Sequence, residues 1–110
     1  MQVASKHTVK VSTDFSPTPG ARVYADGNDS GQEFYDNCLR SAFQQALDDD
    51  EILFIDLDGT EGYATSFLDE AFVRLVRDFG KKTVLSHIQI ISNEEPDWIE
   101  EINSYINEAE

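Results

Sequence analysis

The spacing of hydrophobic positions predicts four strands along the chain. Residues 7–12 alternate apolar and polar side chains, which is typical of a half-buried strand. Residues 22–25 predict a short second strand that pairs with the first as an N-terminal hairpin, across a turn rich in Pro and Gly at 16–20. The nearly continuous apolar run at 52–57 indicates a strand that is covered on both faces. Residues 83–91, rich in Val and Ile, predict the last strand.

Three segments carry hydrophobic residues at helical spacing. The first begins with a capping box at Ser30, and the second repeats that pattern at Ser66 and ends before Gly80, a residue type that favours the position after a helix. The third begins at Pro96. The alternation of strands and helices predicts an α/β domain with a mixed, mostly parallel sheet and three helices. Because 110 residues provide room for one hydrophobic core, we expect a single domain over 1–110.

The charge of the chain restricts its partners. It holds 8 Lys and Arg against 22 Asp and Glu, a formal net charge of −14. Such a field repels nucleic acid and anionic membranes, so the partners that suit it are a protein with a basic face or a cation. The alternative, which the sequence favours, is that the excess charge only keeps the domain soluble. No apolar run suits a signal peptide or a membrane span, and the single cysteine, Cys38, excludes an internal disulfide. We therefore expect a cytoplasmic protein.

The segment 55–60 holds an acidic pair, Asp56 and Asp58, and matches the first motif of haloacid-dehalogenase-type phosphatases. In that family the first Asp attacks a phosphoryl group, and the second acts as acid and base beside Mg²⁺. However, about half of the chain precedes the motif, and no Lys follows Asn93. We therefore expect no catalytic residue, metal or cofactor, and keep a Mg-dependent phosphohydrolase as the alternative. The structural interpretation places both carboxylates at the carboxyl end of a strand, where backbone N–H groups satisfy them and where open α/β sheets bind ligands.

Two longer stretches carry a family resemblance: TPGARVYADGNDSGQEF at 18–34 and IDLDGTEGYATSFLDEAF at 55–72. Together they resemble the bacterial STAS-like domains of unknown function, which are distant relatives of the anti-sigma-factor antagonists. The sequence departs from the common pattern at Ala21, where a second Gly is usual, and at Thr65, where a Ser is usual. The resemblance implies a mixed sheet flanked by helices and a role in regulated contact between proteins.

The same resemblance implies a phosphoacceptor. In the antagonists, an ATP-binding partner kinase phosphorylates a Ser at the start of the helix that follows a central strand. Ser66 has the matching place, with Thr65 beside it, although Phe67 stands where the antagonists have Gly. A phosphate at a helix N-terminus is favoured by the helix dipole, and it would add negative charge to an acidic face and repel a docked partner. The alternative is that Ser66 only caps the helix.

We therefore expect a non-enzymatic regulatory module that docks on a protein partner, such as an ATP-binding kinase-like protein. Tyr63 and Phe67 flank Ser66 and are candidates for an exposed docking patch, although Phe67 is equally suited to pack beneath its own helix. Such a patch would place the partner directly over the candidate phosphoacceptor.

Charged residues in two loops complete the candidate partner-binding set. Arg22 and Asp26 lie at or near the loop 26–31, and Asp58 begins the loop 58–66. Arg22 is suited to bind a partner carboxylate or to pair with a neighbouring Asp. A third hypothesis assigns both loops to a small ligand.

Overall fold

Strands and helices alternate along the part of the chain that the computed structural model describes, residues 7–109. Two short helical turns, α1 and η1, precede the long helical segment, and η2 is a π-helical stretch within it. The elements are β1 (Thr8–Lys10), α1 (Val11–Asp14), η1 (Tyr24–Asp26), α2 (Gly31–Phe34), η2 (Tyr35–Leu39), α3 (Arg40–Asp48), β2 (Leu53–Asp56), α4 (Thr65–Phe79), α5 (Lys81–His87), β3 (Ile88–Ile91) and α6 (Asp97–Glu108).

The described strands form one parallel sheet in the order β1-β2-β3. Val9 is opposite Ile55 in the first pair, and Ile55 is opposite Ile90 in the second. This sheet confirms the α/β fold. The mixed sheet and the N-terminal hairpin are wrong, because residues 22–25 form no strand and contribute instead to the turn η1.

The hairpin prediction fails because the chain turns directly after β1 and then pairs its backbone with the start of α2. Asp14 accepts the backbone N–H of Lys10 at 2.8 Å, and the chain turns into α1 directly after β1. Further along, Gly31 N donates to Ala21 O at 2.8 Å, and Gln32 N donates to Arg22 O at 3.0 Å. The backbone of this segment therefore pairs with the start of α2 and not with β1.

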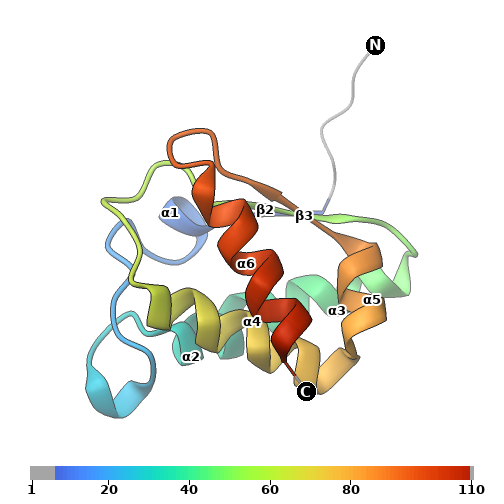
Figure 1. Ribbon diagram of the computed structural model, residues 1–110, viewed down its shortest axis with the longest axis horizontal. Coiled ribbons are helices and arrows are strands. Elements are labelled where there is room, and N and C mark those ends of the chain that lie inside the picture. The colour runs from blue at the N-terminus through green and yellow to red at the C-terminus, as the bar shows by residue number, and fades with distance from the viewer. Residues whose placement is uncertain (1–6, 110) are drawn as a thin grey trace.

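The helices cover one face of the sheet (Figure 1), which appears at the top of the view with α2, α3 and α4 below it. Val9, Leu53 and Ile55 point to that face and are at most 4% exposed. The alternate position Phe54 in β2 is only partly buried, so β2 does not bury all of its side chains as a strand covered on both faces would. Within residues 7–109 the strand therefore follows the alternating pattern of a half-covered sheet.

The first long helical segment is confirmed, with its N-cap. The Ser30 hydroxyl accepts the backbone N–H of Glu33 at 3.0 Å, and helical conformation runs without interruption through α2, η2 and α3. Helix α4 ends at Gly80, whose φ of 93° favours glycine, also as predicted.

The last strand is shorter than predicted, because 81–87 forms the helix α5. Side chains support this helix from within: Ser86 Oγ donates to Lys82 O, and a ring nitrogen of His87 lies 2.9 Å from Thr83 O. Val84 packs into the core. Tertiary packing and these local bonds outweigh the strand preference of Val and Thr.

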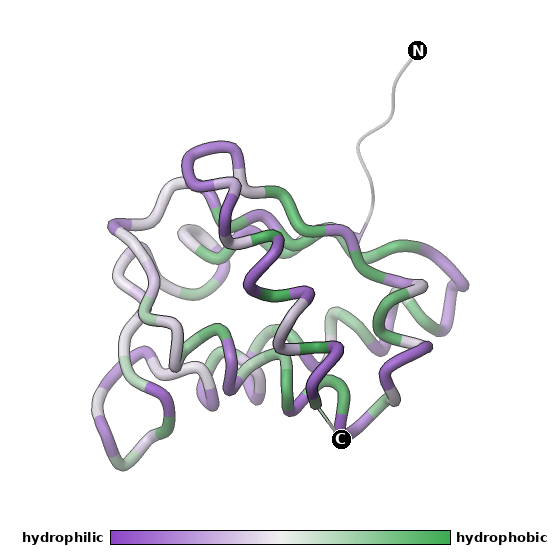
Figure 2. Tube along the Cα trace, viewed as in Figure 1, coloured by the Kyte–Doolittle hydropathy of each residue, from purple (hydrophilic) through white to green (hydrophobic). Residues whose placement is uncertain are grey.

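Helix α6 completes the fold by packing its apolar stripe on α4. Ile102 and Ile106 are fully buried, and Figure 2 shows apolar and polar residues alternating along this helix. None of the helices in residues 7–109 combines the length and the hydrophobicity needed to cross a membrane.

Candidate functional site

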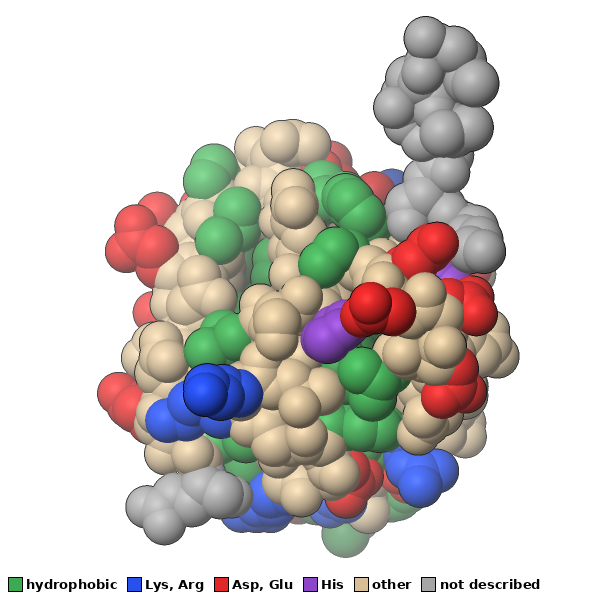
Figure 3. All heavy atoms as spheres, turned by 90° about the vertical axis from the view of Figure 1, so that its right-hand side faces the viewer, with side chains coloured by type: hydrophobic (Ala, Val, Ile, Leu, Met, Phe, Trp, Pro, Cys, Tyr) green, Lys and Arg blue, Asp and Glu red, His purple; other side chains and the backbone are tan. Residues whose placement is uncertain are grey.

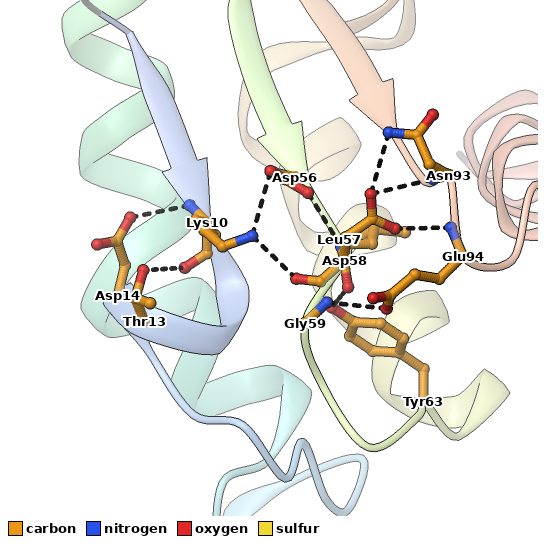
Figure 4. A network of polar contacts seen from close by, with 10 residues as sticks. All are labelled: Lys10, Thr13, Asp14, Asp56, Leu57, Asp58, Gly59, Tyr63, Asn93 and Glu94. Carbon is orange, nitrogen blue, oxygen red and sulfur yellow. Dashed lines mark hydrogen bonds and ion pairs between the residues drawn. The ribbon is translucent and has the colours of Figure 1, made fainter.

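The carboxyl ends of the three strands bring three loops together, and the predicted acidic pair lies among them (Figure 4). Lys10 ends β1, Asp56 ends β2, and Asn93 and Glu94 follow β3. The parallel arrangement produces this meeting, because all three strands run in the same direction.

Asp58 joins the loop after β2 to the loop after β3. Its Oδ1 accepts Glu94 N at 2.9 Å, and its Oδ2 accepts both Asn93 N and Asn93 Nδ2 at 3.2 Å. The reverse bond runs from Gly59 N to Glu94 Oε1 at 2.9 Å. The backbone N–H of Glu94, followed by the N–H groups of Asn93, holds the pKa of the Asp58 carboxyl below its usual value.

Asp56 is paired with a cation from the neighbouring strand. Lys10 Nζ lies 3.4 Å from Asp56 Oδ2 and donates to the carbonyl oxygen of Asp58 at 3.2 Å. The other oxygen, Asp56 Oδ1, accepts Asp58 N at 3.0 Å. Asp56 therefore closes the turn after β2, and its side chain is 22% exposed.

These contacts give the acidic pair a structural role of the kind the sequence suggested. In a phosphatase of the haloacid-dehalogenase type, the second Asp must exchange protons with the substrate, whereas here three N–H groups hold both oxygens of Asp58. Within residues 7–109, no group of three or more His, Cys, Asp or Glu side chains is arranged to hold a metal ion.

Beside this network, the loops after β2 and β3 and the start of α6 line an open cavity of about 330 Å³. Tyr63 and Trp98 lie in its wall, with ring centroids 6.2 Å apart and planes at 80°. The Tyr63 hydroxyl donates to Leu57 O at 2.7 Å, which fixes the ring, and burial raises the pKa of this hydroxyl. The remaining wall is acidic, with Asp58, Glu61, Glu94 and Glu95 in the lining.

The candidate phosphoacceptors lie in the first turn of α4. The helix begins at Thr65, and its N-cap is Ala64, without a side-chain hydrogen bond. The capping box predicted at Ser66 is therefore wrong: its expected partner Asp69 binds Arg22 instead. Among the described residues, the hydroxyls of Thr65 and Ser66 take part in no hydrogen bond. Thr65 is exposed, and Ser66 is partly exposed.

Phe67 does not belong to a docking surface, which corrects that prediction. Its side chain is fully buried, with its ring centroid 5.7 Å from that of Phe34 and 6.1 Å from that of Phe15. The Tyr63 ring is 5.9 Å away and only partly buried. The alternative interpretation, that Phe67 packs beneath its own helix, is thus the observed one. The cluster holds the start of α4 in a fixed position.

Arg22 and Asp26 have different surroundings: Arg22 forms ion pairs, whereas Asp26 is exposed. Arg22 Nη1 binds Asp69 Oδ2 at 3.0 Å and lies 3.5 Å from Glu70 Oε1, so it joins the loop before α2 to α4. The hydrogen bond to Asp69 raises the pKa of the Arg22 guanidinium above its ordinary value. Asp26 is exposed at the end of η1.

The structure adds site residues that the sequence reasoning missed, namely Lys10, Asn93, Glu94 and Trp98. Asn93 and Glu94 follow a strand, so the rule that carboxyl ends of parallel strands meet would have found them. Lys10 was missed because the hairpin prediction placed β1 antiparallel to its neighbour. Trp98 was missed because the sequence pattern places it only on the inner side of the last helix, as a core position.

Comparison with known proteins identifies a family. The family model described as a STAS-like domain of unknown function matches residues 30–98, from the N-cap of α2 into the start of α6. No curated protein and no solved structure shows a significant match to the chain. The match spans more than half of the 110 residues and includes the loop after β2, the start of α4 and Trp98. The resemblance to STAS-like domains is therefore confirmed, and the chain belongs to the STAS-like domains of unknown function.

Proposed function

We propose that this domain is a regulatory protein–protein interaction module without catalytic activity, and that phosphorylation of Ser66 switches its docking. The partner would be an ATP-binding, kinase-like regulator, which is what the sequence resemblance to the anti-sigma-factor antagonists implies. The observation that carries the proposal is the state of the first turn of α4: Ser66 is partly exposed and, among the described residues, has no hydrogen bond that phosphorylation would break.

The residues around Ser66 indicate that a phosphate on it would change the contacts of Arg22. Asp69 and Glu70 lie three and four residues further along α4, on the same side of the helix, and both bind Arg22. A phosphoryl group on Ser66 would compete with them for the guanidinium, because a dianion is the stronger acceptor. The loop that Arg22 holds would then change its attachment to α4, which would alter the surface that the start of α4 offers to a partner.

Thr65 is the less suitable acceptor. It lines a second cavity of about 260 Å³ together with Glu95, Asp97, Glu101 and Trp98. A phosphate on Thr65 would stand among three carboxylates, whereas Ser66 lies about one helical turn before Asp69, which binds Arg22.

Affinity capture from the source cells tests the proposal. The full chain is used as bait in four forms: wild type, Ser66→Ala, Ser66→Asp and the control Ser41→Asp, which adds the same charge at an exposed position in α3. We expect wild type, Ser66→Ala and Ser41→Asp to retain the same partner and Ser66→Asp to lose it. Mass spectrometry of the protein isolated from the cells should show phosphate on Ser66.

Aspartate in the first turn is favourable for a helix, so a loss of binding by Ser66→Asp would not reflect unfolding. Equal retention of a partner by Ser66→Asp and wild type, with no phosphate on Ser66, would remove the support for the switch.

A divalent-metal phosphohydrolase is the second candidate, and one contact favours it. Lys10 Nζ, 3.4 Å from Asp56, is the kind of cation that balances an anionic nucleophile and its phosphate ester. Turnover of p-nitrophenyl phosphate with Mg²⁺, abolished in Asp56→Asn, would establish this candidate. Our proposal expects no turnover above that of Asp56→Asn.

A further inference from the structure

The cavity that Tyr63 and Trp98 line has neighbouring hollows along α6. Glu95 and Trp98 line both this cavity and the one beside Thr65, so the two hollows adjoin each other. A third hollow is lined by Asp97, Glu100, Glu101 and Ser104. Two of these, Asp97 and Glu101, also line the hollow beside Thr65. We call the three hollows together the α6 groove.

The walls of the cavity are held in place before any ligand arrives. The bonds of Asp58 to Asn93 and Glu94 connect the two loops that form it. In addition, Ser92 Oγ donates to Glu95 O at 2.6 Å, and this serine is only 4% exposed. Because the cavity is already ordered, binding there loses little conformational entropy, and even one inserted side chain can contribute to affinity.

The groove has one sign of charge. Carboxylates line all three hollows, and no Lys or Arg belongs to the lining of any of them. Lys81 and Lys82 begin α5, and Lys81 Nζ donates to Asn107 O near the far end of α6. Figure 3 looks onto the side of the molecule on the right of Figure 1 and shows Lys and Arg side chains along its lower part, together with Asp and Glu side chains. The carboxylates that line the hollows therefore make the groove attractive to cations.

We propose that the α6 groove binds a basic segment of the partner protein, with an arginine side chain seated in the cavity that Tyr63 and Trp98 line. The inference deepens the proposed docking function and rests on it. A guanidinium is planar, stacks on aromatic rings and donates hydrogen bonds to carboxylates at its edge, and this cavity offers both aromatic rings and carboxylates. Lysine, a compact and strongly hydrated charge, fits the aromatic walls less well.

Trp98 is the only tryptophan of the chain, so its fluorescence reports on the cavity directly. The full chain is titrated with the peptide acetyl-Gly-Arg-Gly-Arg-Gly-amide and with matched peptides that carry lysine or neutral citrulline in place of arginine. We expect a saturable change of Trp98 emission with the arginine peptide, weaker binding of the lysine peptide, and at least about tenfold weaker binding of the citrulline peptide.

Two variants separate the groove from the general attraction of an acidic protein. Glu61→Gln combined with Glu95→Gln removes two exposed carboxylates of the lining and should raise the Kd of the arginine peptide about three- to tenfold. The control Glu33→Gln removes a charge on α2, outside every hollow of the groove, and should change the Kd less than about twofold. Equal weakening per charge removed, or no emission change with any peptide, would overturn the inference.

The failure of this inference is distinguishable from failure of the docking function. Ser66 lines no part of the groove, so Ser66→Asp should bind the arginine peptide as the wild type does. A partner captured from cells by the wild type and equally well by the Glu61→Gln, Glu95→Gln variant would contradict the groove while the docking function stands.

Discussion

At the scale of single residues, Gly31 shows how closely α2 and α4 approach each other. A Cβ added at Gly31 would lie 2.4 Å from the carbonyl oxygen of Phe67 and 3.1 Å from its carbonyl carbon. These are backbone atoms at the buried start of α4, so no side-chain rotation can relieve the clash. The position of the candidate phosphoacceptor thus depends on the absence of a side chain at Gly31 in another helix.

We predict that Gly31→Ala lowers the free energy of unfolding by about 2 kcal/mol, because an overpacked helix contact forces the backbone to move. Urea unfolding followed by circular dichroism measures it. Ser41→Ala, at an exposed site in α3, should stay within about 0.5 kcal/mol of the wild type. An equally small effect of Gly31→Ala would show that the two helices are farther apart than described here.

Asp58 gives a second prediction, in the pH dependence of stability. Its pKa is lowered in the folded state, so its contribution is present above the ordinary carboxyl pKa of about 4 and is lost as the pH falls through the folded value. Asp58→Asn should therefore melt at a lower temperature than the wild type near pH 7, and the difference should shrink below about pH 4. Thermal unfolding across this range measures it, and a difference that does not vary with pH would contradict the role of the carboxylate.

At the scale of elements, α2 and α4 begin in different ways, although the sequence predicts the same cap for both. Ser30 caps α2, whereas Ser66 lies inside α4, one residue after its start. Asp69, the residue that suggested a capping box, instead accepts a hydrogen bond from Arg22, which belongs to a loop distant in the sequence. A local motif cannot reveal such a competitor, which explains why the same pattern succeeds once and fails once.

The two serines can be compared by parallel substitutions. We predict that Ser30→Ala costs about 1 kcal/mol, because it leaves the N–H of Glu33 without its acceptor. Ser66→Ala should change the stability by less than about 0.5 kcal/mol. Chemical unfolding of both variants under the same conditions decides the matter, since a Ser66→Ala cost that matches Ser30→Ala would restore the capping role.

At the scale of the whole molecule, the sequence predicts the fold class, the long helices and the family, because hydrophobic periodicity and two specific stretches determine them. It does not reveal that β1 is parallel to β2, because a short strand followed by Pro and Gly favours a hairpin. Because of that error, the contact between Lys10 and Asp56 is not predicted from the sequence. The cavity at Trp98 is equally hidden, because it forms only when two separate loops meet.

Two features lie near the carboxyl ends of the strands: the start of α4, which carries Ser66, and the acidic α6 groove. These two features have separate roles in the account. The groove would anchor a basic segment, and the residue beside it, Ser66, would decide whether the partner stays.

The most direct test of the account is the affinity of the captured partner, purified, for the wild type, Ser66→Asp and Ser41→Asp, measured by titration calorimetry. The account predicts that Ser66→Asp raises the Kd at least about tenfold, equivalent to about 1.4 kcal/mol, while Ser41→Asp leaves it within about twofold. Equal affinities of wild type and Ser66→Asp would contradict the claim that the start of α4 switches docking.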